Sequence, residues 1–208
     1  MVKLDPADFT TRIDNPYWPM RPGTRWVYRE AHTDGSVQKV VVRVTSQTRK
    51  LANGITARVV RDTVTEDGAL VEDTTDWYAQ DRNGNVWYMG EQTAEYENGK
   101  VVTTKGSWEA GVDGAQPGIA MPASPRVGMR YRQEYLKGEA EDRAMILGVD
   151  EQAEVAAGHY ADVIMTRDST PLDPKVLELK FFARGVGPVL TFGVSGGGKR
   201  EELTHLDR

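Results

Sequence analysis

The chain has 208 residues and a formal net charge of −5, and its hydrophobic content of 39% includes five Trp, eight Tyr and four Phe. This acidic balance argues against nucleic acid and anionic membranes as partners, because both need a basic surface. The absence of cysteine excludes disulfides, thiolate catalysis and zinc–thiolate sites. No apolar run is long enough for a membrane span, and the length suits one β domain with a sizeable core.

Residues 1–23 are predicted to be an irregular segment, because three prolines within 16–22 exclude a helix and a central strand. Its aromatic residues, Tyr17 and Trp18, have two open roles: a plug over the core or a lip that faces a ligand. The segment lacks the apolar stretch of a signal peptide. We expect an extracytoplasmic protein whose leader is absent from this chain, with a cytoplasmic protein as the alternative.

Five two-residue turn signals recur along residues 24–108. They are Asp34-Gly35, Asn53-Gly54, Asp67-Gly68, Asn83-Gly84 and Asn98-Gly99. Asn-Gly and Asp-Gly supply the positive φ angles of type I′ turns, whose twist matches that of paired strands. Their spacing leaves room for one strand between turns. We therefore predict an antiparallel meander with strands at 24–32, 37–48, 55–66, 69–80, 85–90 and 100–107, and a further short strand at 92–97.

Residues 109–128 contain four glycines and three prolines and are predicted to form a long loop, a feature that is often functional. Strands are predicted again at 129–136, 139–149, 160–168, 175–184, 187–193 and 199–206, with a helix over 139–154 as an alternative. Residues 24–208 are thus predicted to be one all-β domain. It is an antiparallel meander of about 11–12 strands that forms a closed or half-closed barrel with little helix.

Two hairpins allow facing residues to be counted, because a two-residue turn fixes the strand register. Counting from Asp67-Gly68 places Asp62 opposite Asp73, and counting from Asn83-Gly84 places Asp76 opposite Glu91. Facing carboxylates need a cation, a shared proton or solvent. The more apolar side of this sheet is assigned to the interior. It carries Val60, Val64, Val71, Trp77, Ala79, Val86 and Tyr88.

Asp62 and Asp73 are therefore predicted to be an inward, catalytic carboxylate pair, whereas Asp76 and Glu91 form a secondary acidic pair on the outside or at the rim. The same count across Asn53-Gly54 leaves two valines of strand 37–48 on the polar side, so a bulge or a longer loop is predicted there.

Aromatic residues are the predicted lining of a ligand cavity. Arg58 is expected to lie over Trp77 in an inward cation–π contact. The other candidates, which can equally be plain core, are Trp18, Trp26, Trp87, Tyr88 and Trp108. No cofactor is expected, because the three histidines form no metal-ligand pattern, although the facing carboxylates leave a divalent cation such as calcium open.

Three segments together resemble a known kind of protein: Asn15–Tyr28, which reads N-P-Y-x-P-x-x-P-G-x-x-W-x-Y, then 77–88, and then 181–189, which contains A-x-G-V-G. The chain resembles uncharacterised exported bacterial β proteins that are similar in outline to LolA/LolB-like and DUF3108-like half-barrels. This resemblance implies a curved β sheet and an extracytoplasmic location, and it supplies no catalytic residues.

The first functional prediction is a binding module, a β barrel whose aromatic, acid-lined cavity holds a small or amphipathic molecule. The alternative is a carboxylate-dependent enzyme, either a glycan-cleaving hydrolase or a cyclase or isomerase, in which one Asp of the inward pair donates a proton. A third possibility is a structural protein of the cell envelope. The sequence leaves the oligomeric state open.

Overall fold

The structure, a computed structural model, describes residues 4–208, which are built almost entirely of strands. A 3₁₀ turn, η1 (Pro6–Asp8), precedes them. The strands are β1 (Phe9–Thr10), β2 (Arg25–His32), β3 (Val37–Lys50), β4 (Thr56–Glu66), β5 (Ala69–Asp81), β6 (Val86–Glu97), β7 (Lys100–Thr103), β8 (Trp108–Glu109), β9 (Gln116–Met121), β10 (Arg130–Arg132), β11 (Glu134–Tyr135), β12 (Arg143–Val155), β13 (Gly158–Ser169), β14 (Leu177–Ala183), β15 (Gly187–Ser195) and β16 (Lys199–Asp207).

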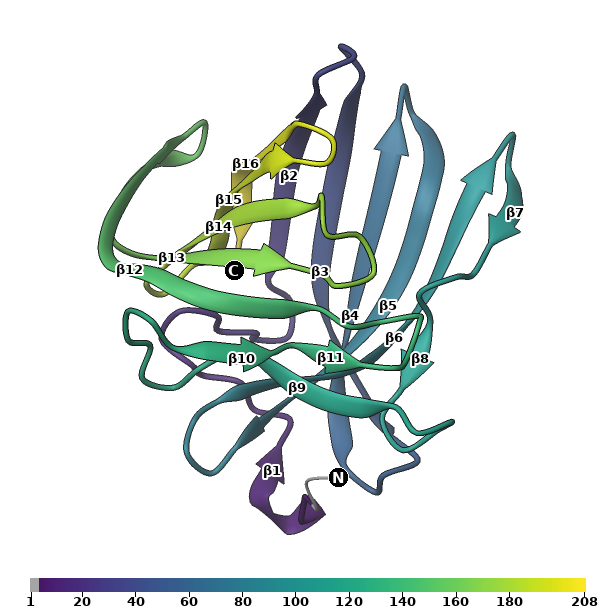
Figure 1. The fold of residues 1–208 in the computed structure, drawn as a ribbon, viewed down its shortest axis with the longest axis vertical. Coiled ribbons are helices and arrows are strands. Elements are labelled where there is room, and N and C mark those ends of the chain that lie inside the picture. The colour runs from purple at the N-terminus through teal and green to yellow at the C-terminus, as the bar shows by residue number, and fades with distance from the viewer. Residues whose placement is uncertain (1–3) are drawn as a thin grey trace.

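The predicted all-β barrel is confirmed. One antiparallel path runs β10-β12-β13-β14-β15-β16-β2-β3-β4-β5-β6-β9-β11. Its two ends are consecutive in the chain, because only Gln133 separates β10 from β11. Residues 130–132 pair with β12 and residues 134–135 pair with β9, so this one short segment closes the sheet. Figure 1 shows the long strands β2–β6 standing upright while β9–β13 cross in front of them.

The turn signals have the backbone conformation that the sequence predicts. Asp67 and Asn98 have φ of 49° and 52°, and the glycine after each also has positive φ. The turn at Asn83-Gly84 is longer, since the N–H of Asp81 donates to the carbonyl of Asn85 and the N–H of Gly84 donates to the carbonyl of Asp81. This longer turn changes the register of the strands that follow.

Several predicted elements differ from the structure. The loop at 109–128 contains β9, which pairs with β6 and β11. The strands expected at 85–90 and 92–97 are one strand, β6, in which Gly90 has a φ of 135°. Strand β12 starts at Arg143 rather than at 139 and continues to Val155, so the helical alternative for this region is wrong. No helix among residues 4–208 is long and apolar enough to cross a membrane.

The main core fills the barrel between its two walls. Buried side chains of β2–β6, such as Trp26, Val44 and Tyr78, pack in one cluster with Ile146 and Phe182 from the opposite wall. A second, smaller cluster lies on the outer face of β5, where Leu4 and Phe9 cover it. Its members are Leu51, Ile55, Ala57, Trp77, Ala79 and Met89. Strand β5 is therefore buried on both faces.

The proline-rich segment before β2 is anchored across one end of the barrel. The side chain of Asn15 donates to the carbonyls of Gly84 and Pro122, and its Oδ1 accepts from the backbone N–H groups of Tyr17 and Trp18. Gln80 Oε1 accepts from the N–H of Asn15 at 2.9 Å. These bonds hold a chain that prolines keep out of regular structure, and they fix the position of Trp18.

Candidate functional site

A cavity of about 210 Å³ lies inside the barrel, next to the anchored N-terminal segment. Its walls combine rings with ionisable groups that come from both sides of the barrel. The aromatic residues are Trp18, Trp26, Tyr28, Tyr78 and Phe182, and the ionisable residues are Asp62, Asp76, Lys180 and Glu201. The remaining lining is Met20, Val40, Val42, Val60, Pro188 and Thr191.

The rings are held in place by packing and by backbone carbonyls. Trp18 lies 5.6 Å from Tyr78 and 5.4 Å from Phe182 between ring centroids, tilted against each. The indole Nε1 of Trp26 donates to the carbonyl of Val186 at 2.8 Å, and the Tyr28 hydroxyl donates to the carbonyl of Pro188 at 3.0 Å. Because their polar atoms already have partners, these two residues offer ring surface to the cavity.

Asp62 on β4 lies between Val42 on β3 and Thr74 on β5. Val42 offers no donor. The Thr74 hydroxyl donates to Glu72 Oε1 at 2.9 Å and shares a hydrogen bond with Thr93 at 2.6 Å. Oδ1 of Asp62 is shielded from solvent and has no hydrogen-bond partner among residues 4–208. Burial, and then the charge of Asp76, raises the pKa of Asp62 well above its ordinary value.

Asp76 and Glu91 face each other on β5 and β6. Tyr88 donates its hydroxyl to Asp76 Oδ1 at 2.7 Å, and its ring stacks on Tyr78 with a centroid distance of 4.9 Å. Burial raises the pKa of Asp76 to about 7, and burial together with Asp76 raises the pKa of Glu91 to about 8. The protonation state of Asp76 therefore affects the titration of Glu91.

Lys180 is the one lysine in the lining, and its charge is already paired. Its Nζ lies 3.3 Å from Asp168 Oδ2 and 3.5 Å from Glu178 Oε2. Burial alone lowers the pKa of Lys180, but Asp168 and Glu178 outweigh burial and raise it. Glu178 also contacts Lys199 at 3.4 Å, and Lys199 contacts Glu30 at 3.2 Å. Lys180, Glu178, Lys199 and Glu30 thus form a ladder of paired charges along one wall of the interior, and Asp62 is not part of it.

The predicted pairing of Asp62 with Asp73 is wrong. The turn at Asp67-Gly68 keeps its register through Leu70, but an extra residue at Val71 then places Glu72 opposite Val64. This bulge shifts β5 by one residue, and a one-residue shift turns each side chain to the other face. Asp73 consequently points outward and binds Arg61 through two hydrogen bonds of 2.8 and 2.6 Å.

Asp76 does face Glu91 as predicted, because two shifts cancel. The longer turn places Gln80 opposite Val86, and a bulge at Met89 then restores the count. The predicted location at the outside or rim is wrong, since Asp76 is only 7% exposed and lines the interior cavity. The bulge at Val71 also reverses part of the predicted interior side, because Trp77 and Ala79 belong to the outer cluster.

Arg58 is buried, but it does not cover Trp77 as predicted. The bulge expected in β3 lies between Val44 and Thr48, and it leaves backbone carbonyls without partners in the ladder. The guanidinium of Arg58 donates to the carbonyls of Thr45, Ser46 and Gln47, and also to that of Thr11. Its burial is explained by this structural role. The cation over Trp77 is Arg49, 4.2 Å from the ring centroid.

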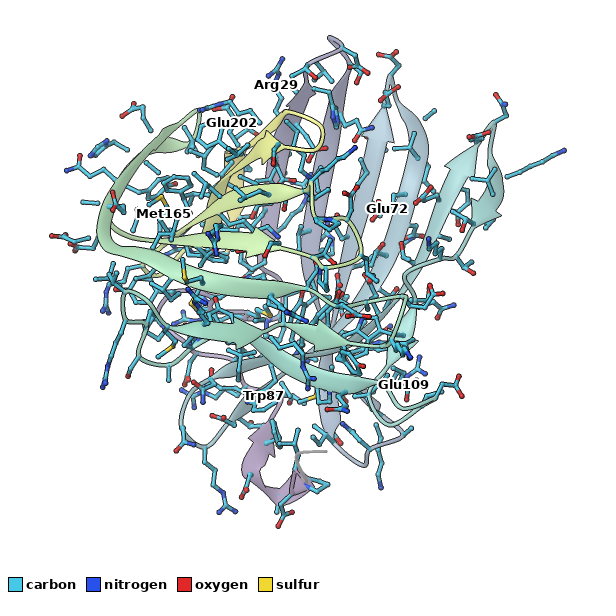
Figure 2. The ribbon with its side chains drawn as sticks, in the orientation of Figure 1. Arg29, Glu72, Trp87, Glu109, Met165 and Glu202 are labelled. Carbon is cyan, nitrogen blue, oxygen red and sulfur yellow. The ribbon has the colours of Figure 1, made fainter. Side chains whose placement is uncertain are left out.

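The other predicted ligand-binding aromatics lie in three places. Trp18 and Trp26 line the cavity, and Tyr88 borders it through Tyr78 and Asp76. Trp108 packs edge-on against Tyr88 in a separate small cluster with three alanines. Trp87 lies on the outside, where it contacts Phe9 and donates to Asp81; Figure 2 shows it low in the molecule, near β1.

Sequence reasoning missed several residues of the cavity: Tyr28, Tyr78, Phe182, Lys180 and Glu201. Strand β16 does not alternate, and β14 alternates apolar and charged residues over Leu177–Lys180 with its charged side toward the cavity. No two-residue turn connects these strands to the first half of the chain, so the register could not be counted across the barrel. Within residues 4–208, no group of three or more His, Asp or Glu side chains has a geometry that could hold a metal ion.

Comparison with known proteins adds little to this geometry. No protein-family model and no curated protein matches the chain. The fold resembles that of a protein from Parabacteroides distasonis ATCC 8503, provisionally described as a lipoprotein, whose crystal structure was determined at 2.70 Å. The two structures match with a TM-score of 0.47 and 13% sequence identity, and the match covers 92% of this chain and 98% of that chain. At this level the likeness carries no argument about ligand or location. The resemblance to LolA/LolB-like and DUF3108-like proteins gains no support from a family match.

Proposed function

We propose that this protein is a binding module whose barrel interior holds a small organic molecule. The observation that carries the proposal is the cavity of about 210 Å³, walled by five aromatic side chains from four separate segments of the chain. An apolar cavity of about 150 Å³ accommodates benzene. The space here therefore suits one ring with a short substituent.

The lining is amphipathic, which favours an amphipathic ligand. Ring surface from Trp18, Trp26 and Phe182 can bury a carbon skeleton, while Asp62 and Asp76 can accept hydrogen bonds from its polar end. Small-molecule sites usually combine mostly apolar walls with a small number of polar groups. This combination supports binding more directly than it supports a structural role, in which the interior would be filled.

Benzyl alcohol is a suitable first probe, because it combines one ring with one short polar group. Val42→Phe places a ring into the cavity, and we expect it to weaken binding at least about tenfold, as followed by saturation-transfer NMR and tryptophan fluorescence. Val41→Phe is the matched control, since the neighbouring side chain points to the other face of β3. Equal binding by wild type and Val42→Phe would contradict the proposal.

A carboxylate-dependent enzyme is the second candidate, and one observation favours it. Asp76 has a pKa of about 7 in the cavity and lies diagonally across from Asp62, so it can both give and take a proton at neutral pH. In this candidate the two carboxyls of the site are Asp62 and Asp76, in place of the predicted pair of Asp62 and Asp73. Turnover of a glycan or other substrate that is lost in Asp76→Asn, with benzyl alcohol binding retained, would favour this candidate.

An extracytoplasmic location is also part of the proposal. It is supported by the N-P-Y-x-P opening and the A-x-G-V-G closing segment, which resemble those of exported β proteins. Fractionation of cells that express the natural protein tests it. Recovery in the cell-envelope or extracellular fraction is expected, and recovery with cytoplasmic markers would overturn it.

A further inference from the structure

Resting on this proposed function, we infer that the cavity selects an organic ammonium ion. Asp62 accepts the N–H groups of the ligand, and the surrounding rings pack on its carbon skeleton. This assignment names the chemical class of the ligand, which the proposed function leaves open. It follows from three features of the cavity: an unpaired carboxylate oxygen, a negative lining and ring surface in reach of the same space.

The unpaired oxygen belongs to Asp62. A buried carboxylate oxygen without a donor is costly, so the rest of a protein normally supplies one. Here the register provides none, because Val42 is apolar and the hydroxyl of Thr74 is bonded to Glu72 and Thr93. A ligand that carries N–H donors would complete this arrangement without moving any strand.

The charge of the lining favours a cation over an anion. Three carboxyls, Asp62, Asp76 and Glu201, line the cavity together with Lys180. The lysine cannot balance them, because Asp168 and Glu178 already hold its ammonium group. An anionic ligand would meet like charge there, whereas an ammonium ion would meet opposite charge.

The rings add a second attraction for the same class of ligand. A cation close to the face of Trp or Tyr is attracted by the ring quadrupole, and the effect is stronger away from water. The polar atoms of Trp26 and Tyr28 are bonded to backbone carbonyls, so these residues contribute ring surface to the cavity. Trp18, Tyr78 and Phe182 extend this aromatic wall.

Three probes of equal size and different charge test the inference: benzylammonium, benzyl alcohol and benzoate. Binding to wild type is measured by calorimetry at neutral pH. We expect benzylammonium to bind at least about tenfold more tightly than benzyl alcohol, because hydrogen bonds to a charged group are the stronger ones. We expect benzoate to bind more weakly than both.

Asp62→Asn removes the charge and keeps the shape. We expect it to bring the affinity for benzylammonium to within about twofold of the affinity that the same variant has for benzyl alcohol. Asp73→Asn is the matched control, since this carboxylate lies on the outer face beside Arg61. Circular dichroism confirms that both variants fold, and the comparison of the three probes on wild type does not depend on any variant.

The outcomes separate the two proposals. The binding module stands if benzyl alcohol binds and Val42→Phe blocks its binding. The ammonium inference is overturned if benzylammonium then binds no more tightly than benzyl alcohol, or if its tighter binding persists in Asp62→Asn. If none of the three probes binds, the binding module itself is overturned. Tighter binding of benzoate than of benzylammonium would also overturn the inference.

Proton release gives an independent readout. Burial and neighbouring carboxyls raise the pKa of Asp62, and a cation bound beside it should lower that pKa again. Binding of benzylammonium should therefore release protons, seen as a dependence of the binding enthalpy on the ionisation enthalpy of the buffer, whereas benzyl alcohol should release none. The carboxyls whose charges act on Asp62 are Asp76, Glu201, Glu72 and Glu30. Equal proton release by both probes would contradict the role of Asp62.

Discussion

Replacement of Asp76 by Asn should change how the stability of the protein depends on pH. The wild-type carboxyl has a pKa of about 7 in the folded protein against an ordinary value of 3.8, and burial is the main cause. Because folding favours its protonated form, the stability is fully present below about pH 4 and is lost as the pH rises through about 7. Asn cannot ionise, so the variant should not show this loss.

The size of the effect follows from the two pKa values. Their difference, at about 1.36 kcal/mol for each pH unit, corresponds to about 4 kcal/mol over the whole range, and somewhat more than half of it falls between pH 5 and pH 8. The carbonyl of Asn can still accept the hydrogen bond from Tyr88. Removing the charge of Asp76 also lowers the pKa of Glu91, which adds to the change.

Urea unfolding followed by tryptophan fluorescence at pH 5, 6, 7 and 8 measures this effect, and the chain has no cysteine to complicate refolding. The free energy of unfolding of Asp76→Asn, relative to wild type, should rise by roughly 2 kcal/mol or more between pH 5 and pH 8. Asp73→Asn removes the half-buried partner of the exposed Arg61 and should cost about 1 kcal/mol or less. Parallel pH profiles for wild type and Asp76→Asn would refute the reasoning.

Three further variants test other parts of the structure by urea unfolding. Asn15→Ala removes the bonds that anchor the N-terminal segment and should cost about 2–4 kcal/mol; a cost below about 1 kcal/mol would mean that the anchor is not needed. Gly118→Ala places a methyl group against the backbone of Arg132 and Gln133, where the barrel closes, and should lower the free energy of unfolding by about 1–3 kcal/mol or more. In the control Gly114→Ala the new methyl group meets nothing within 4 Å, so the loss of stability should come mainly from backbone strain. Lys180→Met should cost about 3–5 kcal/mol, because it leaves Asp168 without its cation in a buried position, and a neutral outcome would contradict the paired ladder.

The sequence by itself determined the class of fold, because the signals are local. Asp67-Gly68 and Asn98-Gly99 adopt the positive φ that two residues are enough to specify, and the strands between the turns follow from them. The same local chemistry predicted a bulge or a longer loop, since two valines would otherwise have faced the polar side, and β3 contains the bulge.

Facing pairs were predictable only where local irregularities cancel. The longer turn at residues 82–84 and the bulge at Met89 have opposite effects, so Asp76 still faces Glu91. No second irregularity compensates for the bulge at Val71, so Asp62 faces Thr74 and not Asp73. A bulge depends on how the strand packs against both neighbours, and neither two-residue turn carries that information.

The cavity itself was decided by the tertiary structure. Asp62 and Trp26 belong to a wall that turn signals could order, but Lys180, Phe182 and Glu201 come from strands more than a hundred residues further on. They meet because β16 pairs with β2 and carries β15 and β14 beside it, while residues 130–135 close the other edge of the barrel by pairing with β12 and β9. Closure depends on contacts between segments that are distant in the chain, whereas turns and alternation act over a few residues. The sequence could therefore predict a barrel, and only the folded chain shows which side chains share its interior.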